Sequence, residues 1–192
     1  LHPRVRRQRQ MCIRDSYQGT LDTTAKTLTN DGLLAATQNP TYLALSAKDC
    51  LYSVDKEDDE GGIAAWQIDG QTAHKLNTVV APGTPPAYVA VDEARQLVYS
   101  ANYHKGTAEV MKIAADGALT LTDTVQHSGH GPRPEQDGSH IHYTDLTPDN
   151  RLAVIDLGSD KVYVYNVSDA GQLSEQSVLT CLLYTSDAAD EL

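Results

Sequence analysis

The sequence contains no phenylalanine, one tryptophan, two methionines and three cysteines among its 192 residues. No apolar run approaches the roughly 20 residues that cross a bilayer as a helix, and no long segment has the 3.6-residue period of an amphipathic helix. These absences argue against a membrane partner and against a helical bundle. Ten tyrosines supply most of the aromatic residues, and tyrosine suits strands whose side chains are half buried.

Several functional motifs are also missing. The sequence has no nucleophilic serine motif, no glycine-rich phosphate-binding loop and no cysteine pair with metal-ligand spacing. Positive charge is scarce: the net charge is −11, to which residues 1–16 contribute +4 and residues 181–192 contribute −3, which leaves −12 for residues 17–180. This balance argues against a nucleic-acid partner.

The two ends of the chain share one possible coding sequence. Residues 11–16 can be encoded by ATG TGT ATA AGA GAC AGC and residues 181–186 by TGT CTC TTA TAC ACA TCT, which are reverse complements apart from their terminal bases. We therefore expect residues 1–16 and 181–192 to be artefactual tails derived from a sequencing adapter. Residues 17–180 are then a fragment of a longer protein. Cys50 is their one cysteine, which we expect to be a buried strand thiol in a cytoplasmic protein.

The middle of the chain repeats itself with a period of about 45 to 55 residues, which is typical of propeller blades. Each repeat has strand-like alternation and turns marked by glycine, asparagine or aspartate. The pattern predicts an all-β fold, a β-propeller fragment of about three to four four-stranded blades. Part of a preceding blade is expected over residues 17–39, with strands at 20–28 and 33–37 around a turn at Asn30-Asp31-Gly32.

A long segment before the third repeat, residues 127–140, concentrates residues that can carry chemistry. His140 and His142 are two apart, so on a strand they face the same side. A histidine can activate water for ester hydrolysis, and the planar guanidinium of Arg133 can bind a phosphate or carboxylate. We expect His127 and His130 to be exposed to solvent as loop residues.

Other interpretations of these residues remain open. Arg133 could simply pair with Glu135, and Glu57 could belong to a solvated acidic loop. Two histidines with carboxylates could bind zinc. Two further arginines, Arg95 and Arg151, lie in what we expect to be ordinary turns.

Several segments resemble signature pieces of the seven-bladed β-propeller lactonases. They are residues 39–43, 99–103 followed by Gly106-Thr107, 131–133 leading to His140-Ile141-His142, and 156–165. The resemblance implies a seven-bladed ring and metal-free, cofactor-free hydrolysis of a small anionic lactone, namely 6-phosphogluconolactone in the pentose phosphate pathway. The loop residues and the resemblance together give the expected site: His140, His142 and Arg133 as catalytic, and His130, Asn102, Tyr103, Glu57 and Glu135 as substrate-binding. The resemblance is what adds Asn102, Tyr103 and Glu57.

Two other functions fit the same fold, because fold alone does not determine substrate. One is a non-catalytic propeller that binds a protein or metabolite, and the other is a cycloisomerase acting on a muconate-type lactone. Because blades bury their faces only against neighbouring blades, we expect the fragment by itself to be inactive and to associate or dissolve poorly. The oligomeric state of the parent protein is left open.

Overall fold

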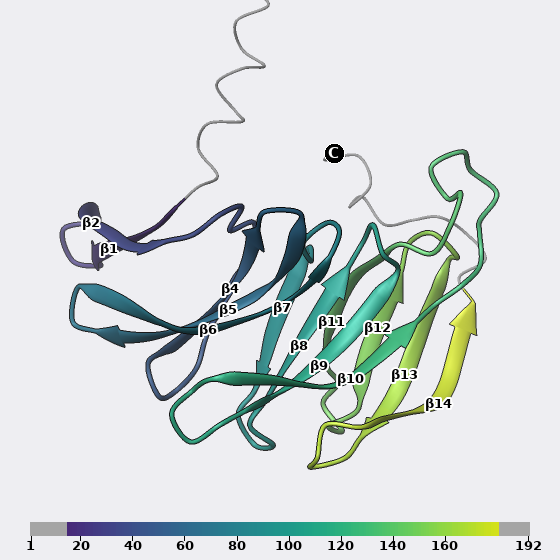
Figure 1. Ribbon diagram of the computed structural model, residues 1–192. Coiled ribbons are helices and arrows are strands. Elements are labelled where there is room, and N and C mark those ends of the chain that lie inside the picture. Colours follow the sequence, from purple (N-terminus) through teal and green to yellow (C-terminus); the bar gives the residue numbers. More distant parts are fainter. Residues whose placement is uncertain (1–14, 181–192) are drawn as a thin grey trace, which may run out of the picture.

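The computed structural model describes residues 15–180, which form antiparallel β-strands with no helix in that range (Figure 1). Three consecutive four-stranded sheets, β3–β6, β7–β10 and β11–β14, follow a two-stranded sheet of β1 and β2, and strands adjacent in sequence are neighbours in each sheet. This confirms the predicted all-β arrangement of blades. The strands are β1 Asp15–Asp22, β2 Thr27–Ala36, β3 Leu43–Leu45, β4 Cys50–Glu57, β5 Glu60–Asp69, β6 Thr72–Pro82, β7 Tyr88–Asp92, β8 Leu97–Asn102, β9 Thr107–Ile113, β10 Leu119–Gln126, β11 Ile141–Leu146, β12 Leu152–Asp156, β13 Lys161–Val167 and β14 Leu173–Thr180.

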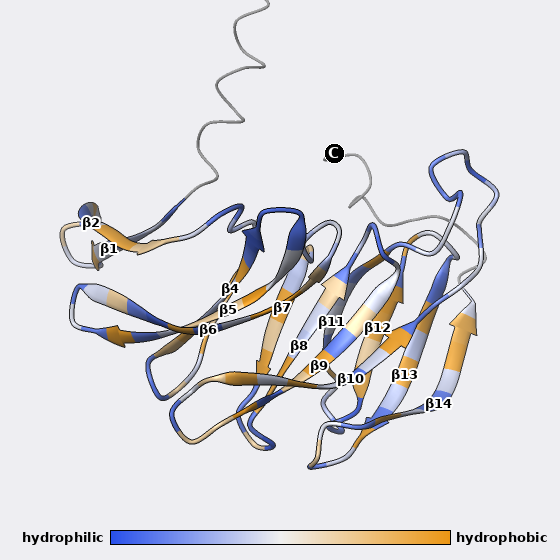
Figure 2. Cartoon of the chain, viewed as in Figure 1, coloured by the Kyte–Doolittle hydropathy of each residue, from blue (hydrophilic) through white to orange (hydrophobic). Residues whose placement is uncertain are grey.

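The hydrophobic core lies between the sheets, as blade-on-blade packing requires. One cluster joins β7–β9 to β11–β13 around Tyr99 and Ile141, and a second joins the β3–β6 sheet to the β7–β10 sheet around Tyr52 and Met111. A smaller cluster around Trp66 packs the β3–β6 sheet against the first sheet. The strands carry most of the apolar residues and the turns are mostly hydrophilic (Figure 2). Cys50 is 4% exposed, which confirms its expected burial.

Tyrosine side chains mark where successive blades converge. Tyr42 precedes β3, Tyr88 begins β7 and Tyr143 lies in β11, so the three occupy corresponding places at the first strands of three blades. The ring centroids of Tyr42 and Tyr88 are 4.4 Å apart, and those of Tyr88 and Tyr143 are 4.6 Å apart. The first strands of the blades therefore lie side by side, as expected for strands that surround a central channel.

The predicted turn at Asn30-Asp31-Gly32 was wrong. The reversal lies at residues 23–26 instead, where the Asp22 carboxylate accepts hydrogen bonds from the backbone amides of Thr24 and Ala25 at 2.8 and 2.9 Å. In β2, Gly32 pairs with Gln18 and Asn30 with Gly19, so Asp31 is an extra residue in a β-bulge. Gly32 has a φ of 115°, a backbone conformation that glycine adopts without strain, and glycine is common in bulges as well as in turns.

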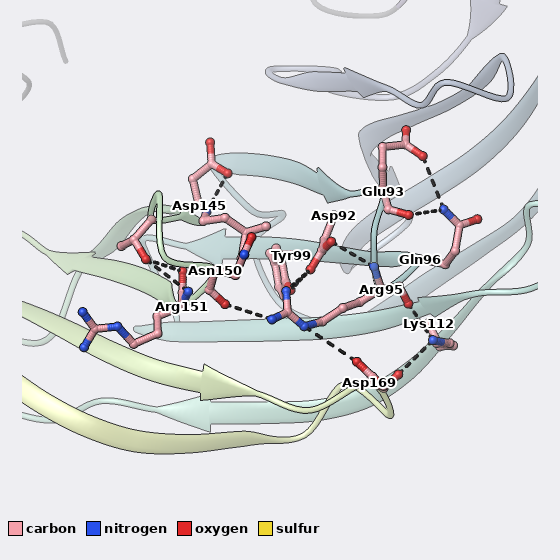
Figure 3. A network of polar contacts seen from close by, with 12 residues as sticks. Asp92, Glu93, Arg95, Gln96, Tyr99, Lys112, Asp145, Asn150, Arg151 and Asp169 are labelled. Carbon is pink, nitrogen blue, oxygen red and sulfur yellow. Dashed lines mark hydrogen bonds and ion pairs between the residues drawn. The ribbon is translucent and has the colours of Figure 1, made fainter.

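A polar network ties the second and third complete blades together at the edge where β7 turns into β8 (Figure 3). The Arg95 guanidinium donates to the Asp92 carboxylate at 2.9 Å and to the backbone oxygen of Asn150, in the next blade, at 3.0 Å. The Tyr99 hydroxyl donates to Asp92 at 2.9 Å, and Lys112 donates to the backbone oxygens of Arg95 and Asp169. The expectation that Arg95 lies in an ordinary turn therefore missed an inter-blade anchor.

The described arc ends in two uncovered sheets. Leu28 in β2 is 74% exposed at one end and Leu179 in β14 is 61% exposed at the other. The predicted artefactual tails lie outside the described residues except for Asp15 and Ser16, which begin β1. Within residues 15–180, no helix is long and apolar enough to cross a membrane.

Candidate active site

One edge of the arc gathers the segments that resemble the lactonases. Because strand direction alternates within each blade, the links between blades and the turn between the second and third strands of each blade meet at the same edge. These segments are residues 37–42, 83–87 and 127–140 between sheets, and 58–59, 103–106 and 157–160 within them. They lie along the upper edge in Figure 1, where residues 127–140 form the green loop.

A pocket of about 490 Å³ opens at this edge. Its walls come from two inter-blade links and the β8–β9 turn, and include Asn39, Thr84, Pro85, Tyr103, His104 and His142. Proline rings and the tyrosine supply apolar surface, and the histidines, asparagine and threonine supply a few polar groups. Such a mixture is typical of small-molecule sites.

His142 presents a neutral imidazole to the pocket. Burial of its half-buried side chain lowers the pKa of His142 below 6.5, so the ring is uncharged at pH 7. Its ring lies edge-on to Tyr103, with centroids 6.0 Å apart and an interplanar angle of 87°. Within residues 15–180, no side chain or backbone group forms a hydrogen bond with its ring nitrogens, so the lone pair remains available to a ligand or a water molecule.

His140 is held differently from His142: it lies just before β11, whereas His142 is within that strand. Its Nδ1 lies 3.1 Å from the backbone oxygen of Tyr103, and its Nε2 lies 3.0 Å from the Asp137 carboxylate. The ring also stacks on Tyr103, with centroids 4.4 Å apart and planes 10° apart. Both ring nitrogens of His140 therefore face hydrogen-bond acceptors. The ring supports Tyr103, and His140 is outside the pocket lining.

A buried carboxylate fixes the backbone beneath these histidines. Asp156, at the end of β12, is 1% exposed. It accepts five hydrogen bonds, from the amides of His140, Gly158 and Ser159 and from the hydroxyls of Ser139 and Ser159. In the two preceding blades, Asp55 near the end of β4 and Asn102 at the end of β8 are also buried. Asp55 accepts from the backbone amide of Gln38, and the Asn102 side chain donates to the backbone oxygen of Thr84. This repeated position, Asp55, Asn102 and Asp156, was the sequence signal that could have identified the anchor.

The 127–140 loop is braced by Gln136, which is 3% exposed. The Gln136 amide donates to the backbone oxygen of Leu157 and to the Asp160 carboxylate, and its oxygen accepts from the backbone amide of Arg133. Arg133 is exposed on this loop and does not line the pocket. His130 and Glu135 are also exposed there and are likewise outside the pocket lining.

His127 was expected to be a solvated loop residue, and that expectation was wrong. It is 6% exposed, its Nε2 lies 2.7 Å from the Tyr165 hydroxyl, and its ring centroid lies 3.7 Å from that of Tyr163. Burial lowers the pKa of His127, although the nearby Asp156 carboxylate acts in the opposite direction. The residue is the first of the loop and packs into the blade, because an imidazole can fill an aromatic cluster while bonding a hydroxyl.

The remaining predicted residues divide between the pocket and its surroundings. Tyr103 lines the pocket. Asn102 is buried, with its amide nitrogen bonded to Thr84 and its oxygen to the Lys105 amide, so it shapes the β8–β9 turn. Glu57 is exposed at the end of β4 and bonds Lys75 at 2.7 Å, away from the pocket lining.

His104 lines the pocket and was missed by the sequence analysis. It follows Tyr103 and precedes Lys105 and Gly106 in the tight turn between β8 and β9. Gly106 has a φ of 61°, and a methyl group there would lie 2.8 Å from the backbone oxygen of Ser139. The glycine therefore lets the turn pack against the neighbouring link, and Tyr103 and His104, which precede it, line the pocket. The position next to Asn102-Tyr103 was the available signal.

No group of three or more histidine, cysteine, aspartate or glutamate side chains within residues 15–180 is arranged to hold a metal ion. The pair His140 and Asp137 is a hydrogen-bonded contact at the rim, and His142 has no carboxylate partner among the described residues.

Comparison with known proteins agrees with the geometry. The family model for the seven-bladed β-propeller lactonases matches residues 14–182. A protein of Lactococcus lactis subsp. lactis (strain IL1403), YwcC, is 55% identical over 158 residues, covering 82% of this chain and 46% of the relative. The 6-phosphogluconolactonase of Bacillus subtilis (strain 168) is 40% identical over 164 residues, covering 83% of this chain and 47% of the relative.

Solved structures show the same relationship. A crystal structure of a protein from Lactobacillus plantarum superposes with a TM-score of 0.85 at 99% identity, covering 86% of this chain and 48% of that one. A putative 6-phosphogluconolactonase from Bacteroides fragilis superposes with a TM-score of 0.78 at 26% identity, covering 86% of this chain and 50% of that one. The chain spans about half the length of the curated relatives it matches. It belongs to the seven-bladed β-propeller lactonase family.

Proposed function

We propose that the complete propeller containing this chain hydrolyses a sugar lactone, with 6-phosphogluconolactone as its substrate and 6-phosphogluconate as its product. The observation that carries this proposal is the neutral imidazole of His142 in a pocket at the channel mouth. A neutral histidine can accept a proton from water as the water attacks an ester carbonyl. The Bacillus subtilis relative, named 6-phosphogluconolactonase, supports the choice of substrate.

Each of the following residues has a separate role in this proposal. His142 is the base, because burial keeps it uncharged and its ring nitrogens face no competing partner among residues 15–180. His140 and Asp137 hold the ring of Tyr103 against the pocket, so His140 is a positioning residue. Arg133 binds the phosphate from the rim, because its loop is braced by Gln136 and its side chain is exposed. His130 and Glu135 share that loop and contact the same end of the substrate.

Asn102 and Glu57 lie farther from the substrate than His142 in this proposal. Asn102 fixes the turn that carries Tyr103, through its bonds to Thr84 and Lys105. Glu57, in β4, pairs with Lys75, in β6 of the same blade, so it would reach a ligand only from the rim. The reaction requires no metal and no cofactor in this proposal. We place it in the cytoplasm, within the pentose phosphate pathway, since its substrate is a phosphorylated sugar lactone.

The test uses a completed propeller, in which residues 15–180 of this chain replace the matched segment of the Lactobacillus plantarum protein. Lactone opening is followed by proton release with 6-phosphogluconolactone. We expect His142→Ala to lower kcat/KM by about 100-fold or more, as loss of a general base does, and Arg133→Ala to raise KM. Undiminished turnover in both variants would remove the site assignment. Turnover of a muconate-type lactone in place of the sugar lactone would instead favour a cycloisomerase.

A further inference from the structure

We propose that His104 is a second catalytic residue, which protonates the ring oxygen of the lactone as that oxygen leaves. This inference rests on the proposed lactone hydrolysis. The argument starts from the position of His104, at the tip of the β8–β9 turn and in the lining of the same pocket as His142.

The turn that carries His104 is fixed on both sides. The Asn102 side chain accepts from the Lys105 amide at 3.0 Å and donates to the backbone oxygen of Thr84 at 2.8 Å. Gly106 packs against Ser139 of the next link. His104 is exposed, and its ring lies edge-on to Tyr103, with centroids 5.2 Å apart and planes 80° apart. The ring is thus held at the mouth by its own turn and by a wall of the pocket.

The histidines near this edge of the arc differ in what their ring nitrogens contact. Those of His140 face Tyr103 and Asp137, and Nε2 of His127 faces the Tyr165 hydroxyl. For His104 and His142, no described residue forms a hydrogen bond with the ring nitrogens. These two rings lie 5.2 and 6.0 Å from the centroid of Tyr103, so two imidazoles with available nitrogens border one cavity beside the same tyrosine.

Opening a lactone requires two proton transfers that one neutral imidazole does not perform at once. His142 accepts a proton from water while the water oxygen forms a bond to the carbonyl carbon. The bond between that carbon and the ring oxygen then breaks, and the electron pair stays on the oxygen. His104 in its protonated form donates a proton to this alkoxide, which leaves as a hydroxyl group. The carboxylic acid formed releases its proton to water, and proton exchange with solvent returns both histidines to their starting states.

Two lactones with different leaving groups distinguish this role from a structural one. Gluconolactone releases an alkoxide, which needs protonation, whereas dihydrocoumarin releases a phenoxide, whose conjugate acid has a pKa of about 10 and leaves without help. In the completed propeller, we expect His104→Gln to lower kcat/KM for gluconolactone by about 100-fold and to leave dihydrocoumarin hydrolysis nearly unchanged. His74→Gln, which replaces an exposed histidine outside the pocket lining, is the matched control and should change neither rate.

An equal loss on both substrates would overturn the role of His104 as an acid and assign it to binding or to turn structure. Unchanged hydrolysis of both would overturn any catalytic part. If the unsubstituted completed propeller opens no lactone, including 6-phosphogluconolactone, the proposed function itself fails. Hydrolysis by the unsubstituted protein together with a uniform effect of His104→Gln would defeat only this inference.

Discussion

Removal of the buried Asp156 carboxylate, at the end of β12, is expected to destabilise the link that precedes β11. Asp156 is 1% exposed and accepts five hydrogen bonds. Asp156→Ala leaves three backbone amides without an acceptor, at His140, Gly158 and Ser159. The two serine hydroxyls can rotate toward other partners, but the amides cannot. An unsatisfied buried donor costs about 1–3 kcal/mol, so we expect a loss of about 3–5 kcal/mol after partial relaxation.

Asp156→Asn is the matched control, because it keeps the shape and one acceptor oxygen. With its oxygen in the place of Oδ1, the asparagine still accepts from the amides, and its NH₂ group can donate to the hydroxyls of Ser139 and Ser159, which also accept. We expect a loss of about 1 kcal/mol, the net value of an exchanged hydrogen bond.

The assay is denaturant unfolding of the completed propeller, with hydrogen exchange to localise the effect. The amides of His140, Gly158 and Ser159 should lose protection in Asp156→Ala, while β8 amides such as that of Tyr99 keep theirs. Equal stability of the alanine and asparagine variants, or unchanged protection at the three amides, would refute the reasoning that Asp156 anchors this link.

Three further results are expected. Gly158→Ala places a methyl group against the backbone oxygen of Gly138 and should lower the melting temperature in thermal unfolding by several degrees. In the control, Gly138→Ala, the added methyl group has no atom of the described residues within 4 Å, and the melting temperature should stay the same. Burial opposes ionisation of Asp92, but hydrogen bonds from Arg95 and Tyr99 outweigh it and lower the pKa of Asp92. The ionised carboxylate therefore contributes folding stability that is present above the unfolded pKa of about 4 and is lost as pH falls through the folded value. Asp92→Asn should flatten this acid dependence of stability. A dependence as steep as that of the unsubstituted protein would contradict the pairing. Because the faces bearing Leu28 and Leu179 are uncovered, residues 15–180 alone should self-associate with rising concentration in sedimentation velocity, and a monomer at all concentrations would contradict this.

The sequence predicted the blades well because each strand carries its own local signals. Alternating side chains and the turns between strands depend on residues that are neighbours in sequence. Asn30-Asp31-Gly32 was misplaced because glycine with a positive φ serves both turns and bulges. The choice between them depended on a competing turn that Asp22 stabilises. The sequence pattern does not show which of the two possible turns is more stable.

The candidate site was predicted only in part, because its chemistry depends on contacts between blades. The spacing of His140 and His142 predicted that both lie on one strand, but β11 begins at Ile141 and contains only His142. The spacing also could not show that Tyr103 and Asp137 face the nitrogens of His140. The burial of His127 depends on Tyr163 and Tyr165, more than 30 residues away. Loop composition suggested solvent exposure there, and packing overrode it.

The pH dependence of kcat/KM for 6-phosphogluconolactone in the completed propeller tests most directly whether His142 is the base. Burial lowers the pKa of His142 below its ordinary value of 6.5, so the base is protonated at a lower pH than a free imidazole. We predict an acid limb with its midpoint below pH 6.5 that disappears, with most of the rate, in His142→Ala and persists in His140→Gln. The same acid limb in His142→Ala, at undiminished rate, would contradict the account.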